Sequence, residues 1–281
     1  MNNFNQRKDI KVALIQMNSV ANQEVNLQKA IELSKQALSK NAKLIAFPEV
    51  FNYRKRYKSE AIHKETLDGK CVTIFKDLAK SYNCYILLGS ISELIPNSKK
   101  VYNTSVMISD KGAVIGVYRK MHLFDVEVDN VKIKESSVFE RGDSPELVSV
   151  CGHNLGMSIC YDLRFAELYR YYTCQNATII AVPSSFTKKT GQAHWLTLLK
   201  ARAIENQVYV LAPNQVGIGG NGIETFGHSV IIDPWGTVVA CGSASNEEVV
   251  IGDVSVSEIE RIRKGLPCLD HRLDTLNNNN Y

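Results

Sequence analysis

The chain has 281 residues, of which 44% are hydrophobic and 22% are charged, and its formal net charge is +4 at pH 7. This composition is typical of a globular protein, and the small charge argues against a nucleic-acid-binding surface. No apolar run approaches the roughly 20 residues of a membrane span, and the N-terminus lacks the apolar stretch of a secretory signal. The seven cysteines include no Cys-x-x-Cys pair, which disfavours a disulfide framework or a zinc ribbon. We therefore expect a cytoplasmic protein with no membrane or nucleic-acid partner.

In the first 120 residues, short apolar runs alternate with segments whose apolar side chains recur at helical spacing. The pattern predicts strands at residues 10–16, 44–47 and 84–89, and helices at residues 26–39 and 72–82. It then changes to a β-hairpin, in which residues 104–108 and 113–118 flank a turn at 109–112. This alternation of strands and helices indicates an α/β protein.

The second half of the chain repeats the pattern of the first. The similar pairs are LIAFPEVF (44–51) with IIAVPSSF (179–186), CYIL (84–87) with VYVL (208–211), and SVMISDKGAV (105–114) with SVIIDPWGTV (229–238). The last two pairs share an offset of 124 residues. We therefore predict two similar β/α halves within one domain over residues 1–270, followed by a tail at 271–281. Two sheets packed face to face, with helices on both outer faces, would bury such apolar runs.

A cysteine stands at the end of the apolar run 155–159 in the string NLGMSICYDLRF. The residues after Cys160 have helical spacing, with one apolar face formed by Phe165, Leu168, Tyr169 and Tyr172. A strand that passes directly into a helix would place the sulfur at the positive end of the helix dipole, where the thiol pKa falls. The pattern favours a nucleophile, and the alternative is a buried structural cysteine.

Glu49 and Lys120 also follow predicted strands. Glu49 comes after a buried strand and a rigid proline, and Lys120 comes after the hairpin. Attack of a thiol on an amide needs a base for the sulfur proton and a cation where the oxyanion develops. The two residues can supply these groups. Alternatively, the glutamate forms a salt bridge at a strand end and the lysine lies in solvent.

Three strings resemble the catalytic signatures of the nitrilase, or carbon–nitrogen hydrolase, superfamily. They are FPEVF, YRKMHLFDVE and GMSICYDLRFAEL, and they occur in the family's order. The resemblance continues through SSFTKKTGQAHW, LKARAIENQVYVLAPNQ and FGHSVIIDPWGTVVA, so it covers nearly the whole chain. It implies a four-layer αββα sandwich with pseudo-two-fold symmetry, in agreement with the internal repeat.

The same resemblance implies roles for individual residues. Glu49 would be the general base, Lys120 would stabilise the oxyanion, and Cys160 would be the nucleophile. The backbone N–H of Tyr161 would complete the oxyanion hole, and Glu135 would orient the lysine and the substrate amine. No cofactor is expected, and no metal site, since the chain has no cluster with metal-ligand spacing.

Within the superfamily, CYDLRF, SFTKKTGQAHW and GHSVIIDPWG resemble the branch of small α-keto-acid amidases. The implied substrate is a small-molecule amide, with deaminated glutathione preferred. The alternatives are an omega-amidase acting on 2-oxoglutaramate, an N-carbamoyl-amine hydrolase, and, from a different class, a catalytically idle scaffold that keeps the fold.

The branch resemblance also implies substrate-binding residues. Arg164 would hold the α-keto carboxylate in its planar guanidinium fork, Thr190 would donate or accept a hydrogen bond, and Phe186 would form a pocket wall. The alternative for Arg164 is an ion pair with Asp162 or Glu167 on the same helix.

Two positions depart from the branch pattern. Ala166 replaces a proline that often follows the Arg-Phe pair, and Asp-Asn at 129–130 stands where Pro-Gly is common. The second departure predicts a different shape for the loop that carries Glu135.

Three further features of the sequence have interpretations other than catalysis. The string GIGGNG (217–222) matches a dinucleotide fingerprint but is followed by no helix, so we expect a flexible loop. His194 and His228 could each pair with Cys160 as in a thiol protease, but both open regular elements and are expected to be structural. The run RKRYK (54–58) is expected to be a solvated face or a basic mouth that recruits a polyanionic substrate.

The superfamily resemblance further implies a homodimer or a larger homo-oligomer. On this expectation, Tyr171, Tyr172 and Cys174 on the helix after the nucleophile could lie at a subunit interface.

Overall fold

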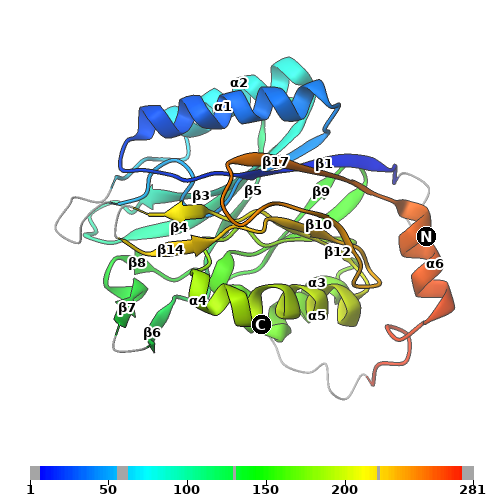
Figure 1. Ribbon diagram of the computed structural model, residues 1–281. Coiled ribbons are helices and arrows are strands. Elements are labelled where there is room, and N and C mark those ends of the chain that lie inside the picture. Colours follow the sequence, from blue (N-terminus) through cyan, green and yellow to red (C-terminus); the bar gives the residue numbers. More distant parts are fainter. Residues whose placement is uncertain (1–6, 56–62, 129–130, 220–221, 274–281) are drawn as a thin grey trace.

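The computed structural model describes residues 7–55, 63–128, 131–219 and 222–273. Figure 1 shows two β-sheets that face each other, with helices on the outer face of each sheet. Helices α1 (Gln23–Ser39) and α2 (Lys70–Tyr82) cover the first sheet, and α5 (Leu196–Asn206), with α3 (Ala166–Cys174) beside it, covers the second. The expected αββα sandwich is confirmed.

The two sheets are built from strands of the two halves of the chain. Across the first sheet the order is β17 (Glu248–Val254), β1 (Ile10–Gln16), β2 (Leu44–Ala46), β3 (Tyr85–Leu94), β4 (Val101–Ile108) and β5 (Val114–Arg119), and β8 (Phe139–Glu140) also pairs with β4. Across the second sheet the order is β9 (Glu146–Val150), β10 (His153–Met157), β11 (Ile179–Ala181), β12 (Tyr209–Ala212), β15 (Val230–Ile232) and β16 (Val238–Cys241).

The strand directions repeat as well as the strand order. β1, β2 and β3 are mutually parallel, as are β10, β11 and β12, and an antiparallel strand lies on each side of both groups. In this correspondence β2 matches β11, β3 matches β12, and the β4–β5 hairpin matches β15–β16. The repeat predicted from the similar strings is therefore present in the topology.

Smaller elements connect the sheets and surround their ends. They are the pairs β6 (Asp125–Val128) with β7 (Val131–Lys134) and β13 (Val216–Ile218) with β14 (Glu224–Phe226), the short helix α4 (Lys188–Thr190), the 3-10 turns η2 (Glu135–Ser137) and η3 (Cys160–Arg164), the π-helical turn η4 (Gly191–Trp195), and α6 (Val256–Gly265).

Strand β1 shows how apolar runs place the sheets. Successive side chains of a strand point to opposite faces, so a strand covered on both faces is apolar throughout. Val12 and Leu14 lie in the core between the two sheets, whereas Ala13 and Ile15 face the helices of the outer layer. All four are fully buried, as expected for a central strand that is covered on both faces.

Element boundaries differ modestly from the predictions. Helix α1 begins three residues earlier than expected, because the side chain of Asn22 accepts a hydrogen bond from the N–H of Val25 and caps the helix. Strand β3 continues to Leu94, five residues beyond the predicted end. The expected interface position of Tyr172 is wrong, since this ring is fully buried and its hydroxyl donates to the carbonyl of Met157.

Across the described segments, no helix is long and apolar enough to cross a membrane. The single domain over residues 1–270 stays a prediction. Of the predicted tail, only residues 271–273 are among those described.

Candidate active site

A pocket of about 840 Å³ lies where loops from the two halves of the repeat meet. Its wall contains every side chain predicted as catalytic or substrate-binding: Glu49, Lys120, Glu135, Cys160, Tyr161, Arg164, Phe186 and Thr190. Residues separated by more than a hundred positions in the sequence are thus brought into one cavity.

Glu49 follows strand β2 at a point of close backbone packing. A Cβ added at Gly89 on β3 would lie 2.0 Å from the carbonyl oxygen of Phe47, so only glycine lets the two segments meet there. The next residue, Val50, has a left-handed φ of 54°, and its N–H donates to Ser90 Oγ at 2.9 Å. A β-branched residue with positive φ is strained, and such strain clusters at functional sites.

Lys120 follows strand β5 and is only 2% exposed, so the solvated alternative is wrong. Its Nζ donates to Glu49 Oε1 at 2.9 Å and to both carboxylate oxygens of Glu135, also at 2.9 Å. A buried ammonium needs such partners, because an unpaired charge in the interior is costly. The two carboxylates therefore hold the lysine in one position.

Asn103 also joins this cluster, although the sequence did not point to it. Its Nδ2 donates to Glu49 Oε1 at 2.9 Å and lies 3.3 Å from Glu135 Oε1. The residue lies on β4, one position before the predicted start of that strand. The feature of the sequence that could have identified it is a single amide side chain within the largely apolar string VYNTSVMI. A second unpredicted contact comes from the other half of the repeat, where the N–H of Ser185 donates to Glu49 Oε2 at 2.9 Å.

Glu135 lies in the turn η2, after the β6–β7 pair. Besides Lys120, its carboxylate accepts a hydrogen bond from the N–H of Phe124 at 2.6 Å. The departure at residues 129–130 lies outside the described residues, so the expected change in loop shape stays a prediction.

Cys160 begins the turn η3 and is partly exposed in the pocket. Its φ is 49°, the left-handed region that non-glycine residues rarely adopt. Its N–H donates to the carbonyl of Pro183 at 2.9 Å, which fixes the sharp turn against the segment that follows β11. The carboxylate of Glu49 lines the same pocket and acts on the pKa of the thiol.

The expected lowering of the thiol pKa is wrong. Burial raises the pKa of Cys160 well above its ordinary value, and the negative charge of Glu49 raises it further, against a smaller opposing effect of Lys120. The assumed helix dipole is absent at this point, because β10 ends at Met157 and a short 3-10 turn precedes α3. Cys160 is therefore a protonated thiol near the carboxylate of Glu49.

The charged neighbours of the thiol also have shifted pKa values. Burial favours the neutral form of Glu49, but the Lys120 ammonium and hydrogen bonds from Lys120, Cys160 and Asn103 hold its pKa below the ordinary value. Burial disfavours the ammonium, yet Glu135 and Glu49 hold the pKa of Lys120 well above its ordinary value. Burial raises the pKa of Glu135, and the charge of Glu49 adds to this, despite Lys120. Glu49 is thus ionised and ready to accept a proton.

Arg164 ends η3 and lies against aromatic rings of the pocket wall. Its guanidinium carbon is 5.7 Å from the ring centre of Tyr161 and equally far from that of Phe186, and its Nη2 is 3.3 Å from His194 Nδ1. Among the described residues no ion pair joins it to Asp162, whose carboxylate accepts a hydrogen bond from Ile159 N–H and contacts Tyr118 and His122. The helix ion-pair alternative is not observed in this part of the chain.

The remaining predicted residues occupy the walls. Thr190 Oγ1 lies 2.7 Å from Thr187 Oγ1, and the ring of Phe186 packs on Trp195 at 4.9 Å between centres. The ring of Tyr161 meets Phe124 edge-on at 4.9 Å.

The two histidines and the basic run, which were not expected to be catalytic, lie in different environments. His228 is structural, since its Nδ1 lies 2.8 Å from the carbonyl of Phe226. His194 is exposed and contacts Arg164, so it borders the pocket rather than being a buried structural residue. In the basic run, Arg54 is 7% exposed and lines the pocket, which contradicts a solvated face at that position. Residues 56–58 of that run lie outside the described residues.

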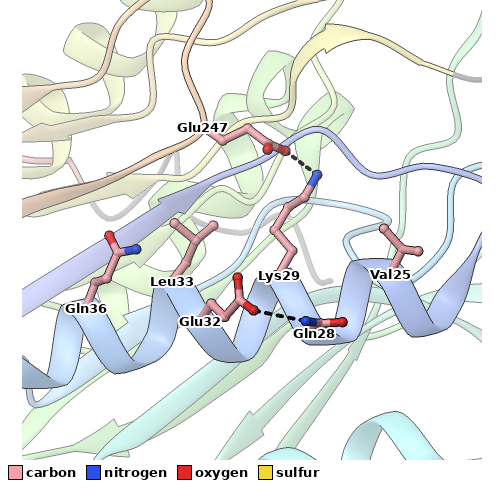
Figure 2. Close-up of a pocket in the computed structure, with 7 residues that line it drawn as sticks. All are labelled: Val25, Gln28, Lys29, Glu32, Leu33, Gln36 and Glu247. Atoms are coloured by element: carbon pink, nitrogen blue, oxygen red, sulfur yellow. Dashed lines mark hydrogen bonds and ion pairs between the residues drawn. The ribbon is translucent and has the colours of Figure 1, made fainter.

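A second hollow of about 390 Å³ lies on helix α1, away from these residues (Figure 2). Its lining residues are Val25, Gln28, Lys29, Glu32, Leu33, Gln36 and Glu247. Lys29 and Glu247 form an ion pair across it, and none of the predicted site residues lines it. Within the described ranges, no three His, Cys, Asp or Glu side chains gather in a way that could hold a metal ion.

Comparison with known proteins agrees with this geometry. The family model described as carbon-nitrogen hydrolase matches residues 11–264. The chain is 39% identical over 276 residues to the deaminated glutathione amidase of Dictyostelium discoideum, covering 93% of each chain. It is 36% identical over 255 residues to omega-amidase NIT2-B of Xenopus laevis, covering 89% of this chain and 90% of that protein.

A solved structure with a similar fold is that of the NitFhit protein of Caenorhabditis elegans. The TM-score is 0.89 at 33% sequence identity, and the match covers 96% of this chain and 66% of that chain. The chain likewise spans 58% of the nitrilase and fragile histidine triad fusion protein of Drosophila melanogaster, to which it is 37% identical over 270 residues.

Proposed function

We propose that this member of the carbon–nitrogen hydrolase family is a cysteine-dependent amidase of a small α-keto acid. As a member of that family, the chain is a hydrolase that acts on carbon–nitrogen bonds other than peptide bonds. The observation that carries the proposal is the contact network of the pocket. Lys120 Nζ lies 2.9 Å from both Glu49 and Glu135, and Cys160 lines the same cavity as these three groups.

In the first half of the proposed reaction, the Cys160 sulfur attacks the amide carbon while its proton passes to Glu49. The pKa of the thiol is raised and that of Glu49 is lowered, so transfer is driven by bond formation in the transition state rather than by a standing thiolate. The negative charge that develops on the amide oxygen is stabilised by the Lys120 ammonium and the N–H of Tyr161. Protonated Glu49 then gives its proton to the leaving nitrogen, and a thioester remains.

In the second half, Glu49 removes a proton from a water molecule that attacks the thioester. Lys120 again stabilises the oxyanion, the carbon–sulfur bond breaks, and the sulfur regains a proton from Glu49. Glu135 holds the lysine in place throughout and does not itself carry the transferred proton. The reaction consumes one water and yields a carboxylic acid and an amine or ammonia.

We propose deaminated glutathione as the preferred substrate. Support comes from the 36–39% identity to proteins of that named activity in Dictyostelium discoideum, Synechocystis and Homo sapiens. The pocket volume of about 840 Å³ is in the range that encloses a ligand of tripeptide size. Arg164, beside Phe186 in the wall, would bind the carboxylate next to the keto group.

The test is formation of 2-oxoglutarate, which both deaminated glutathione and 2-oxoglutaramate release on hydrolysis. Cys160→Ala is expected to lower kcat by at least about 10⁴-fold, because the nucleophile is lost. Cys241→Ala, which removes an exposed cysteine outside the pocket, is the matched control and should leave kcat unchanged. Full activity of Cys160→Ala would refute the mechanism.

The second candidate is omega-amidase activity on 2-oxoglutaramate, favoured by the 36% identity to the Xenopus laevis relative. A higher kcat/KM for 2-oxoglutaramate than for deaminated glutathione would select it. The N-carbamoyl-amine alternative predicts carbon dioxide release from an N-carbamoyl amine, which the same enzyme preparation can be tested for.

A further inference from the structure

Arg54 is a buried cation in the pocket wall that the proposed reaction does not use. The side chain is only 7% exposed and lines the same cavity as the nucleophile. Its Nη2 donates to the carbonyl of Ile223 at 3.3 Å, and its buried Nη1 has no hydrogen-bond partner among the described residues. Burial lowers its pKa to about 10, against the charge of Glu49, which acts in the opposite direction.

The guanidinium is held in place by a glycine of the GIGGNG string. A Cβ added at Gly219 would lie 2.2 Å from Arg54 Cζ, so any larger residue would displace the charged group. The N–H of Gly219 donates to the carbonyl of Ile223, the same carbonyl that accepts from Arg54. Arg54 of the basic run, which was expected to form a solvated face or a basic mouth, therefore meets Gly219 of the string that was expected to be a flexible loop.

A buried guanidinium with incomplete hydrogen bonding is costly unless an anion compensates it. The nearby carboxylate of Glu49 does not serve, because its oxygens accept from Lys120, Asn103 and the N–H of Ser185. A ligand carboxylate would supply both the charge and the acceptor, in the geometry that a guanidinium fork matches.

We propose that Arg54 binds a second carboxylate of the substrate, distinct from the one at Arg164, so that the pocket selects amides with an acid on the leaving amine. The two arginines share no partner, since Arg164 contacts His194 and Phe186 whereas Arg54 contacts Gly219 and Ile223. The inference rests on the proposed function and sharpens it. Deaminated glutathione has a carboxylate at each end, whereas 2-oxoglutaramate has a single one beside its keto group.

The test compares KM for these two substrates in the wild type, Arg54→Gln and Arg54→Lys. Loss of a charge-assisted bond predicts a rise of about 10- to 100-fold in KM for deaminated glutathione in Arg54→Gln, with kcat little changed. Arg54→Lys, which keeps the charge, should recover part of this loss. The KM for 2-oxoglutaramate, which lacks the second carboxylate, is the internal reference.

The matched control is Lys64→Gln, which removes one charge from the same segment. Lys64 lies outside the pocket wall and contacts the carbonyls of Ser98 and Lys99, so KM for both substrates should stay at the wild-type value. An equal rise for both substrates in Arg54→Gln, or no rise for either, would overturn the proposal and indicate a structural arginine.

Gly219→Ala provides a test that keeps the arginine. It should raise KM for deaminated glutathione selectively, because the new methyl group displaces the guanidinium. Calorimetric binding of both amides to Cys160→Ala, with and without Arg54→Gln, separates this inference from the proposed function. Arg54-dependent binding without wild-type turnover would support the subsite and reject the reaction, whereas turnover that ignores Arg54 would do the reverse.

Discussion

The ends of strands β2 and β11 occupy equivalent places in the two halves of the repeat. Each strand is the middle one of a parallel trio, and each is followed by one further backbone hydrogen bond to the neighbouring strand. These bonds run from the N–H of Phe47 to Leu87 at 2.9 Å and from the N–H of Val182 to Leu211 at 2.8 Å. A proline follows in both halves, so the backbone leaves the two sheets in the same way.

The side chains that come next are different in kind. In the first half the residue after the proline is Glu49, whose carboxylate accepts a hydrogen bond from Lys120 and lines the same pocket as Cys160. In the second half it is Ser184, which is fully buried and donates its hydroxyl proton to the carbonyl of Val182 at 3.0 Å. The end of β2 therefore carries a charged side chain in the pocket, whereas the end of β11 carries a neutral side chain that bonds to its own backbone.

Two buried amide side chains, Gln16 and Gln215, form a neutral hydrogen-bonded region, called here the neutral end. Gln16, at the end of β1, donates to the carbonyls of Ser243 and Asn246 at 2.8 and 2.9 Å and accepts from the N–H of Ser229 at 2.8 Å. Gln215 donates to Ser19 Oγ at 2.8 Å. Gln16 Nε2 also lies 3.4 Å from the carboxylate of Glu248, and Gln215 also donates to the backbone carbonyl of Glu49 at 2.9 Å. The buried side chains of this region are amides rather than ions.

The difference shows where the fold accommodates buried charge. Neutral hydrogen bonds contribute about 0.5–1.5 kcal/mol each and tolerate burial, whereas an unpaired buried ion costs several kcal/mol. In this fold, buried neutral side chains surround Gln16 and Ser184, whereas the ions Glu49, Lys120 and Glu135 are paired with one another. Changing the two regions in matched ways should give unequal results.

The largest effect is expected at the charged end. Lys120→Met should lower kcat by about 10²- to 10³-fold through loss of oxyanion stabilisation. It should also destabilise the fold by about 3–5 kcal/mol, because Glu49 and Glu135 would face each other without a cation. Activity assays and urea unfolding measure the two effects, and the loss of stability should shrink in acid as the carboxylates are protonated. Undiminished stability at pH 7 would contradict the ion-pair account.

A change at Glu49 should separate reactivity from catalysis. The thiol pKa of Cys160 is raised in part by Glu49, so in Glu49→Gln this pKa falls and alkylation by iodoacetamide at pH 8 becomes faster. Hydrolysis becomes slower, since the base is lost. In the wild type, the alkylation rate should rise with pH beyond the ordinary thiol value of 9.0. Mass spectrometry of the labelled peptide gives the rate, with Cys160→Ala as the control for other cysteines, and slower labelling of Glu49→Gln would contradict the assignment.

The smallest effect is expected at the neutral end. Gln16→Met keeps the volume and leaves a buried N–H and two carbonyls without their partner, at a cost of about 1–3 kcal/mol. Because Gln16 is not in the pocket wall, kcat should stay within about twofold of the wild type, as expected for sites that share no partners. Thermal unfolding and 2-oxoglutarate formation provide the two measurements. A large loss of kcat with an intact fold would show that the two ends are coupled.

The repeat and the roles of single residues could be predicted to different extents. Apolar runs such as those of β1 and β2 are read directly from the sequence, because strands buried on both faces leave no room for polar residues. Asn103 was missed because it stands alone in such a run, and its meaning depends on Glu49 and Glu135, which are distant in the sequence. The sequence predicts a solvated face or a basic mouth for the run that contains Arg54, because no local pattern shows that this side chain is buried against Gly219.

The sequence by itself determined the strand and helix pattern and the internal repeat, because these depend on local periodicity. It also pointed to Glu49, Lys120 and Cys160, because they stand next to strand ends within strings that resemble the family's signatures. Only the tertiary structure decided the protonation of the Cys160 thiol. The pKa of Cys160 depends on burial and on the charge of Glu49, and both are set by long-range packing of the two halves. Charge and desolvation act through space, so the electrostatics of this pocket exist only once the two sheets have come together.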